Sequence, residues 1–115
     1  MIDFDRDTAF TQRVLDALTA RANATMKNIA NRNTTGFKRY EVRFEDYLQD
    51  AVREGRDLAS VEPKVIRDAS GDPDVNNVVL MDELALLGKT ALLHDVMARR
   101  MGSYARKMNK AIFGR

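Results

Sequence analysis

Cysteine is absent from this sequence of 115 residues, and histidine occurs once. Without cysteine the chain forms no disulfide, binds no metal through thiolates and has no cysteine nucleophile. The one histidine, His94, lies on an apolar helical stripe, where a packed or interfacial role is expected rather than a catalytic one. The glycines are scattered, so there is no glycine-rich loop of the kind that binds phosphate. We therefore expect no enzymatic activity, no cofactor and no metal site.

Long apolar runs are absent as well. No stretch approaches the roughly 18 apolar residues that read as a membrane-spanning helix. The first ten residues carry three acids and lack the apolar segment of a secretory signal peptide. We expect neither a membrane span nor a cleaved signal peptide. The length suits one domain, and an apolar content of 44% excludes a wholly disordered chain.

Charge is divided unevenly along the chain. All seventeen acidic residues precede position 96, together with thirteen basic residues, which leaves this part with a net charge of −4. The last twenty residues carry six basic side chains and no acidic one. Such asymmetry is typical of binding to nucleic acid or an anionic membrane, or of self-complementary assembly, and a solvated helix end is the simplest interpretation. The alternative function is therefore a small helical protein that binds nucleic acid or an anionic membrane through residues 96–115.

Two long segments have the apolar spacing of amphipathic helices, from about Asp7 to Asn31 and from about Asn77 to Ile112. The spacing predicts a mainly all-α fold in which these helices form an antiparallel, coiled-coil-like hairpin with a short irregular or extended middle insert. Antiparallel packing would place Leu18 near Ala98 or Met101. The residues expected along the packing and assembly seam are Leu15, Leu18, Ala22, Ile29, Leu84, Leu87, Ala98, Met101, Met108 and Ile112. The second helix has more apolar faces than one partner helix can cover, which predicts contacts with neighbouring molecules.

The middle of the chain contains only short predicted elements. Tyr40 and Val42 alternate with charged residues, which predicts an extended segment, and a short helix ending near Gly55 follows. The residues around Pro63 predict a second extended strip, and residues 70–74 have turn composition and are expected to be the most flexible part. The chain thus divides into an N-terminal helix (1–33), a middle insert (34–76) and a C-terminal helix (77–115).

Polar residues mark the start of the second helix. Asn76 or Asn77 is expected to cap it. The acidic pair Asp82 and Glu83 suits its first turn, where we expect solvated or capping carboxylates.

The stretch NIANRNTTGFK, residues 28–38, ends the first helix with good turn residues. It resembles the N-terminal signature of bacterial flagellar rod and hook proteins, which reads N-I-A-N-x-x-T-P-G-[YF]-K. The matching residues are Asn28, Ile29, Ala30, Asn31, Thr34, Gly36, Phe37 and Lys38. Thr35 stands where the family usually has proline.

A second resemblance lies further along the chain. Residues 62–68 resemble an extended strip of the short proximal rod proteins in this family, and residues 76–84 resemble the N-N-V-D-L-E-x-E-[ML] start of their C-terminal helix. Val79 and Met81 depart from acidic positions of that pattern. The residues that match it are Asn76, Asn77, Val78, Leu80 and Glu83. Chain length also favours the short proximal rod proteins, because hook and distal rod proteins carry larger middle domains.

The resemblance implies a structural subunit of the proximal rod of the flagellar basal body. Such subunits are exported by the flagellar type III apparatus without a cleaved signal peptide. They polymerise in the periplasmic rod, the drive shaft that joins the membrane ring and export gate to the distal rod and transmits torque. The implied partners are further copies of the same chain, the adjacent rod protein FlgC, the ring-to-rod adaptor protein and the export apparatus. The terminal helices would form the inner layer of the rod.

Overall fold

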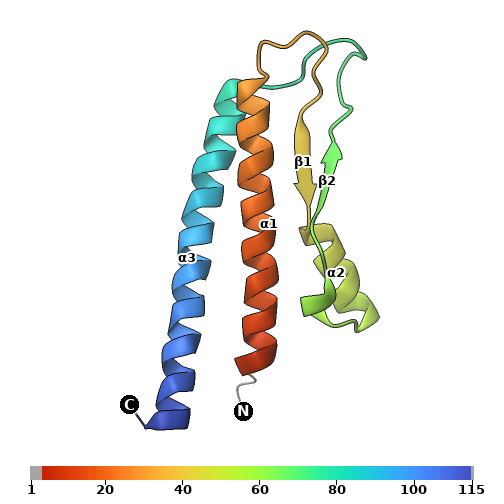
Figure 1. Ribbon diagram of the computed structural model, residues 1–115. Helices are drawn as coiled ribbons and strands as arrows, with labels where there is room; N and C mark the ends of the chain where they lie inside the picture. The colour runs from red at the N-terminus through yellow and green to blue at the C-terminus, as the bar shows by residue number, and fades with distance from the viewer. Residues whose placement is uncertain (1–3, 115) are drawn as a thin grey trace.

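A computed structural model describes residues 4–114, so Asp3 and Arg115 lie outside the described residues. Two long helices precede and follow a middle insert of two strands and two short helices, and the insert lies on one side of the first long helix (Figure 1). In chain order the elements are α1 (Phe4–Ala30), β1 (Tyr40–Arg43), α2 (Glu45–Glu54), the 3₁₀ helix η1 (Leu58–Ser60), β2 (Lys64–Arg67) and α3 (Leu80–Phe113). The prediction of a mainly helical fold with long terminal helices is confirmed.

The long helices α1 and α3 lie side by side and run in opposite directions, and the insert lies against α1 (Figure 1). Their 27 and 34 residues correspond to about 40 and 50 Å of helix. The molecule measures 60 × 31 × 14 Å and has a radius of gyration of 17.6 Å. A compact domain of this length has a radius of about 13 Å. The chain is therefore a flat rod with little interior.

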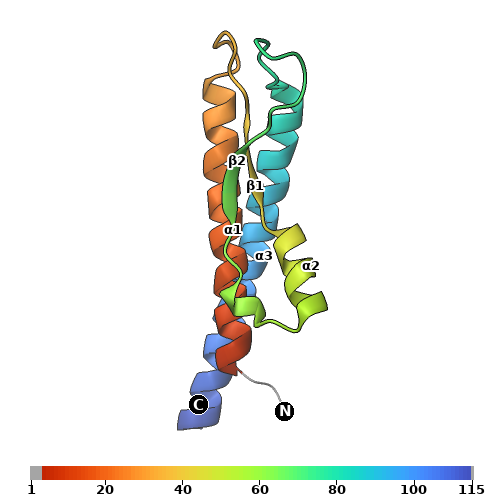
Figure 2. The ribbon, with the colours of Figure 1, turned by 90° about the vertical axis from the view of Figure 1, so that its right-hand side faces the viewer.

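The strands β1 and β2 form an antiparallel two-stranded sheet that packs on α1 (Figure 2). Tyr40 lies opposite Arg67, and Val42 lies opposite Val65. The predicted extended segments are confirmed, and the structure adds that they pair with each other. Val42 is buried because it faces the helix.

A small apolar core joins α1 to α2 and η1. It consists of Ala17, Phe44, Ala51 and Val61, each at most 4% exposed. The helix α2 ends at Gly55, which has the left-handed φ of +68° that glycine adopts without strain. The predicted end of the short helix near Gly55 is confirmed.

Some of the buried residues on each long helix lie seven or fourteen positions apart, as expected for helices that pack along a seam. They are Thr11, Leu18 and Thr25 on α1, and Glu83, Thr90 and Tyr104 on α3. Polar side chains occupy most of these positions, and the buried hydroxyl of Thr90 has no hydrogen-bond partner within the described chain. A search for apolar spacing does not detect a seam of this kind.

The predicted seam is partly wrong for packing within the chain. Leu84, Ala98 and Ile112 are exposed, because the buried stripe of α3 passes through Glu83 and Thr90 instead. Contacts of these three residues with other molecules stay a prediction. Leu18 is buried, and the half-buried members of the predicted seam are Leu15, Ala22, Ile29, Leu87, Met101 and Met108.

The start of α3 also differs from the prediction. The helix begins at Leu80, and its N-cap residue is Val79, which makes no side-chain capping bond. Asn76 and Asn77 therefore do not cap it. The Asn76 side chain bonds to the turn after α1, and the Asn77 side chain bonds to Arg39 and Asp68.

Candidate functional site

The residues of the two predicted motifs meet at one end of the molecule, where α1 ends and α3 begins. Asn28 is wholly buried in the last turns of α1. Its amide nitrogen donates to the carbonyl of Tyr40 at 2.8 Å, and its amide oxygen accepts from the Tyr40 N–H at 2.7 Å. The side chain thus bonds to β1 as a neighbouring strand would. This pair of bonds fixes the strand against the helix.

Glu83 connects the first turn of α3 to the same place. Its carboxylate is 1% exposed and accepts from Arg39 Nε at 2.6 Å and from Asn28 Nδ2 at 3.2 Å. The prediction of a solvated or capping carboxylate is wrong for Glu83, because the helix turns this residue toward α1 and β1. A buried carboxylate requires a partner of opposite charge. Arg39 supplies that charge.

Arg39 also pairs with a second carboxylate, that of Asp68. Its Nη1 donates to Asp68 at 3.3 Å and lies 3.7 Å from Glu41. Burial of the guanidinium lowers the pKa of Arg39, but the hydrogen bonds and charges of Glu83 and Asp68 outweigh this and raise its pKa above the ordinary value. Hydrogen bonds from Ser70, together with the charge of Arg39, hold the pKa of Asp68 below its ordinary value. Arg39 and its carboxylate partners thus link the start of β1, the chain after β2, and α3.

Asn77 extends this linkage along the sheet. Its amide oxygen accepts from the Arg39 N–H at 2.7 Å, and its amide nitrogen donates to the Asp68 carbonyl at 2.6 Å. The Asp68 N–H donates directly to the Arg39 carbonyl at 2.9 Å. The Asn77 side chain therefore fills the one position of the strand ladder that the two backbones leave open. This role replaces the predicted helix cap.

Asn76 binds the turn that ends α1. Its amide nitrogen lies within hydrogen-bond distance of the carbonyls of Asn31 (2.9 Å), Arg32 (3.2 Å) and Thr34 (2.7 Å). Its oxygen accepts from the Val78 N–H at 2.8 Å. The carbonyls at the end of a helix lack partners within it. Asn76 thus satisfies the end of α1 and holds it beside the start of α3.

The turn itself is built by the remaining residues of the first motif. Asn31 donates from its side chain to the Lys27 carbonyl at 2.8 Å, and the Thr34 hydroxyl donates to Asn31 at 3.1 Å. Gly36 has a φ of +72°, as the predicted turn requires. The Phe37 ring meets the Tyr40 ring edge to face, with centroids 5.9 Å apart. Of the other two motif residues, Ile29 is half-buried and Ala30 is exposed.

Lys38 organises the loop at residues 70–75. Its ammonium group donates to the carbonyls of Ser70 (3.0 Å), Asp72 (2.7 Å) and Val75 (2.8 Å). An ammonium group has three donors, and all three are used. The segment predicted to be the most flexible is therefore tied to the motif by one side chain.

Sequence reasoning missed Arg39, Tyr40, Asp68 and Arg21. Arg21 donates to the Val42 carbonyl at 2.8 Å and to Glu45, whose pKa it lowers through that hydrogen bond. In the sequence Arg39 and Arg21 resemble ordinary solvated charges, and no pattern marks their partners. Spacing alone does not identify them.

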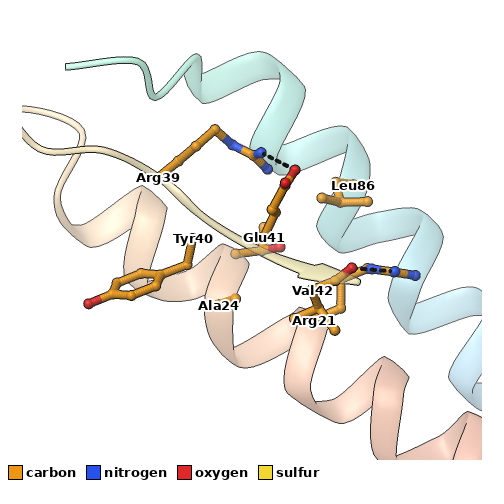
Figure 3. A pocket seen from close by; sticks show the side chains of 8 residues that line it. Arg21, Ala24, Arg39, Tyr40, Glu41, Val42 and Leu86 are labelled. Carbon is orange, nitrogen blue, oxygen red and sulfur yellow. Dashed lines mark hydrogen bonds and ion pairs between the residues drawn. The ribbon is translucent and has the colours of Figure 1, made fainter. Parts of the chain in front are cut away.

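A small cleft of about 150 Å³ lies between β1 and the two long helices (Figure 3). Arg21 and Arg39 border it from opposite ends, with Glu41 and Leu86 between them. Both arginines already have carboxylate partners, and Arg21 also donates to the Val42 carbonyl. No group of histidine and carboxylate side chains in residues 4–114 is arranged to hold a metal ion.

The side chains of the site bond to the chain's own backbone and to one another. No protein-family profile matches the chain. The chain is similar to the flagellar basal body rod protein FlgB of Borreliella burgdorferi (strain ATCC 35210 / DSM 4680 / CIP 102532 / B31). The two are 27% identical over 131 aligned positions, which cover 95% of this chain and 97% of that protein.

Proposed function

We propose that this chain is a structural subunit of a flagellar basal-body rod. The observation that carries the proposal is the similarity to FlgB, because it extends over almost the whole of both chains. A similarity of that extent includes both terminal helices and the insert. The motif residues that resemble the rod and hook family provide separate support, because they meet at one structured junction.

The surface of α3 supports assembly with other subunits. Large apolar side chains are exposed along it, among them Leu84 (45% exposed), Leu92 (65%), Val96 (52%) and Ile112 (66%). So many large apolar side chains exposed on one helix favour contacts with other molecules. We propose that further copies of the chain cover this surface in the rod. The adjacent rod protein FlgC and the ring-to-rod adaptor protein are the other proposed neighbours.

The finer features follow from the same proposal. The chain would be exported by the flagellar type III apparatus without a cleaved signal peptide and assembled in the periplasmic part of the proximal rod. There the terminal helices would form the inner layer of a coiled-coil-like shaft that transmits torque. No helix in residues 4–114 is long and apolar enough to cross a membrane.

Electron microscopy of isolated basal bodies tests the proposal. Cells would carry a copy of the chain with a small tag in the exposed segment at Gly55, and gold-labelled antibody would locate the tag. We expect label on the rod, and loss of the rod when the gene is deleted. Intact rods in the deletion strain, or label elsewhere on the structure, would contradict the proposal.

A further inference from the structure

The outer edge of strand β1 is closed by side chains of α1. In an antiparallel ladder only alternate residues exchange hydrogen bonds with the partner strand, and the others direct their N–H and C=O groups away from it. In β1 the groups directed away belong to Tyr40 and Val42. Asn28 bonds to both groups of Tyr40, and Arg21 bonds to the carbonyl of Val42.

The outer edge of strand β2 is open. Val65 and Arg67 lie opposite Val42 and Tyr40, so their backbone groups point away from β1. Within residues 4–114 no hydrogen bond reaches the backbone N–H or C=O of either residue on that side. An open strand edge is a template for pairing with another chain. A sheet of only two short strands also gains stability from a third.

A groove runs beside this open edge. Val65 forms one wall, and the exposed face of α1 around Ala20, Asn23 and Lys27 forms another. The groove has a volume of about 280 Å³, and Tyr40 also lines it. Val65 is 53% exposed within it. An extended segment placed here would pair with β2 and cover this valine.

The positive charge of Lys27, Lys64 and Arg67 near the groove favours an acidic partner. The ammonium groups of Lys27 and Lys64 lie 5.7 Å from the ring centre of Tyr40 and 5.5 Å from that of Tyr47. The Arg67 guanidinium lies 3.7 Å from the ring centre of Tyr40. None of the three cations pairs with a carboxylate in the described part of the chain. A second copy of β2 would add its own Lys64 and Arg67 to an edge that is already basic, which disfavours pairing of β2 with itself.

We propose that the open edge of β2 binds an extended, acidic segment of a partner protein by strand addition. Backbone bonds to Val65 and Arg67 hold the segment. Its carboxylates lie on both of its faces, toward Lys27 and Arg67 on the side of the groove and toward Lys64 on the opposite side of the sheet. The inference does not depend on the rod assignment, because it follows from the edge, the groove and the charges of a single chain.

Peptide binding to the full chain tests the inference. Fluorescence anisotropy would compare a labelled short peptide that repeats Asp-Asp-Val-Val, which presents carboxylates on both faces of an extended chain, with one that repeats Lys-Lys-Val-Val. We expect the acidic peptide to bind at least about tenfold more tightly. N-methylation of those amides in the acidic peptide that face β2 should abolish binding. The amide protons of Val65 and Arg67 should exchange more slowly when the unmodified acidic peptide is bound.

Charge-reversed variants separate this edge from general attraction. Lys27→Glu with Lys64→Glu should weaken the acidic peptide about tenfold or more, whereas the matched pair Lys107→Glu with Lys110→Glu, at the far end of α3, should not. Equal weakening by both pairs, or unchanged binding after N-methylation, would overturn the inference. Failure of the acidic peptide to bind would overturn it as well, and so would tighter binding of a peptide with the β2 sequence of residues 62–68. Slow exchange of the Asp68 amide in the free chain reports that the sheet is formed, and its absence would also count against the inference.

Discussion

Arg39, just before β1, and Glu83 in α3 form a charged hydrogen bond of 2.6 Å, although 44 positions separate them in the sequence. The carboxylate is buried and the guanidinium is mostly buried, with 2% and 18% of their side chains exposed. Asn28 of α1 donates to the same carboxylate. The buried carboxylate of Glu83 therefore joins both terminal helices to the insert.

Replacement of Glu83 by alanine should lower the free energy of unfolding by about 3–5 kcal/mol, because it leaves a largely buried guanidinium without its main partner. Urea unfolding followed by circular dichroism measures this. The matched control is Asp82→Ala, one residue away and exposed, for which we expect a change below about 1 kcal/mol. Adding Arg39→Met to Glu83→Ala should cost less than the sum of the two single changes. Strict additivity would contradict the coupling.

Asn28→Asp should destabilise the chain by about 3 kcal/mol or more at neutral pH. The new carboxylate loses the donor to Tyr40 and faces the carboxylate of Glu83. The loss should shrink as the pH falls toward about 4, where the new carboxyl group gains a proton. Asn33→Asp, at an exposed turn position, serves as the control and should change stability by less than about 0.5 kcal/mol. A pH-independent loss would show that shape rather than charge is responsible.

Lys38→Met should loosen the loop at residues 70–75 without unfolding the long helices. Methionine keeps the length of the side chain but has no donor for the carbonyls of Ser70, Asp72 and Val75. Hydrogen exchange read by mass spectrometry should become faster in this loop and stay unchanged in α1. The control Lys89→Met, on an exposed position of α3, should leave the loop as it is. Unchanged exchange in the Lys38 variant would mean that other contacts hold the loop.

Alanine should have opposite effects at two glycines. Gly36 has a left-handed φ of +72°, so Gly36→Ala should cost roughly 1–2 kcal/mol of stability. Gly88 lies inside α3, and a Cβ there would meet no atom within 4 Å. Gly88→Ala should therefore stabilise the helix by roughly 1 kcal/mol. Thermal unfolding measures both, and a shift of the same sign at both sites would contradict the assignment of backbone conformations.

An engineered disulfide tests the register of α1 and α3. Asn28 contacts Glu83, so equal rise along antiparallel helices places Leu18 opposite residues 93–94. This is about one turn away from the expected neighbour Ala98 and about two turns away from Met101. Leu18→Cys should therefore link efficiently to His94→Cys within one chain.

The comparison pair for that test is Leu18→Cys with Met101→Cys. Seven residues along a helix span about 10 Å, which exceeds the 4.4–6.8 Å between the Cα atoms of a disulfide. The chain has no native cysteine that would compete. Efficient linkage of Leu18 to Met101 would mean a shifted register, and linkage to Leu84 would mean parallel helices.

The sequence by itself determined the elements of this protein. Apolar spacing predicted both long helices, alternation predicted the first strand, and the apolar residues around Pro63 predicted the second. The glycines at positions 36 and 55 marked where the chain turns. These signals are local, because each depends on residues a few positions apart. The motif of residues 28–38 also located the junction correctly, although the function of its side chains did not follow from it.

Only the tertiary structure decided what the polar residues do. Asn76 and Asn77 have the sequence context of helix caps, yet one holds the end of α1 and the other completes the strand ladder. Glu83 and Thr90 occupy the buried stripe of α3 in place of Leu84 and Ala98. Local hydrophobicity predicts an apolar residue at a buried position, but the distant residue Arg39 makes the buried carboxylate of Glu83 tolerable. Hydrogen bonds between segments 40 or more residues apart leave no periodic trace in a sequence. They appear once the two helices are placed side by side.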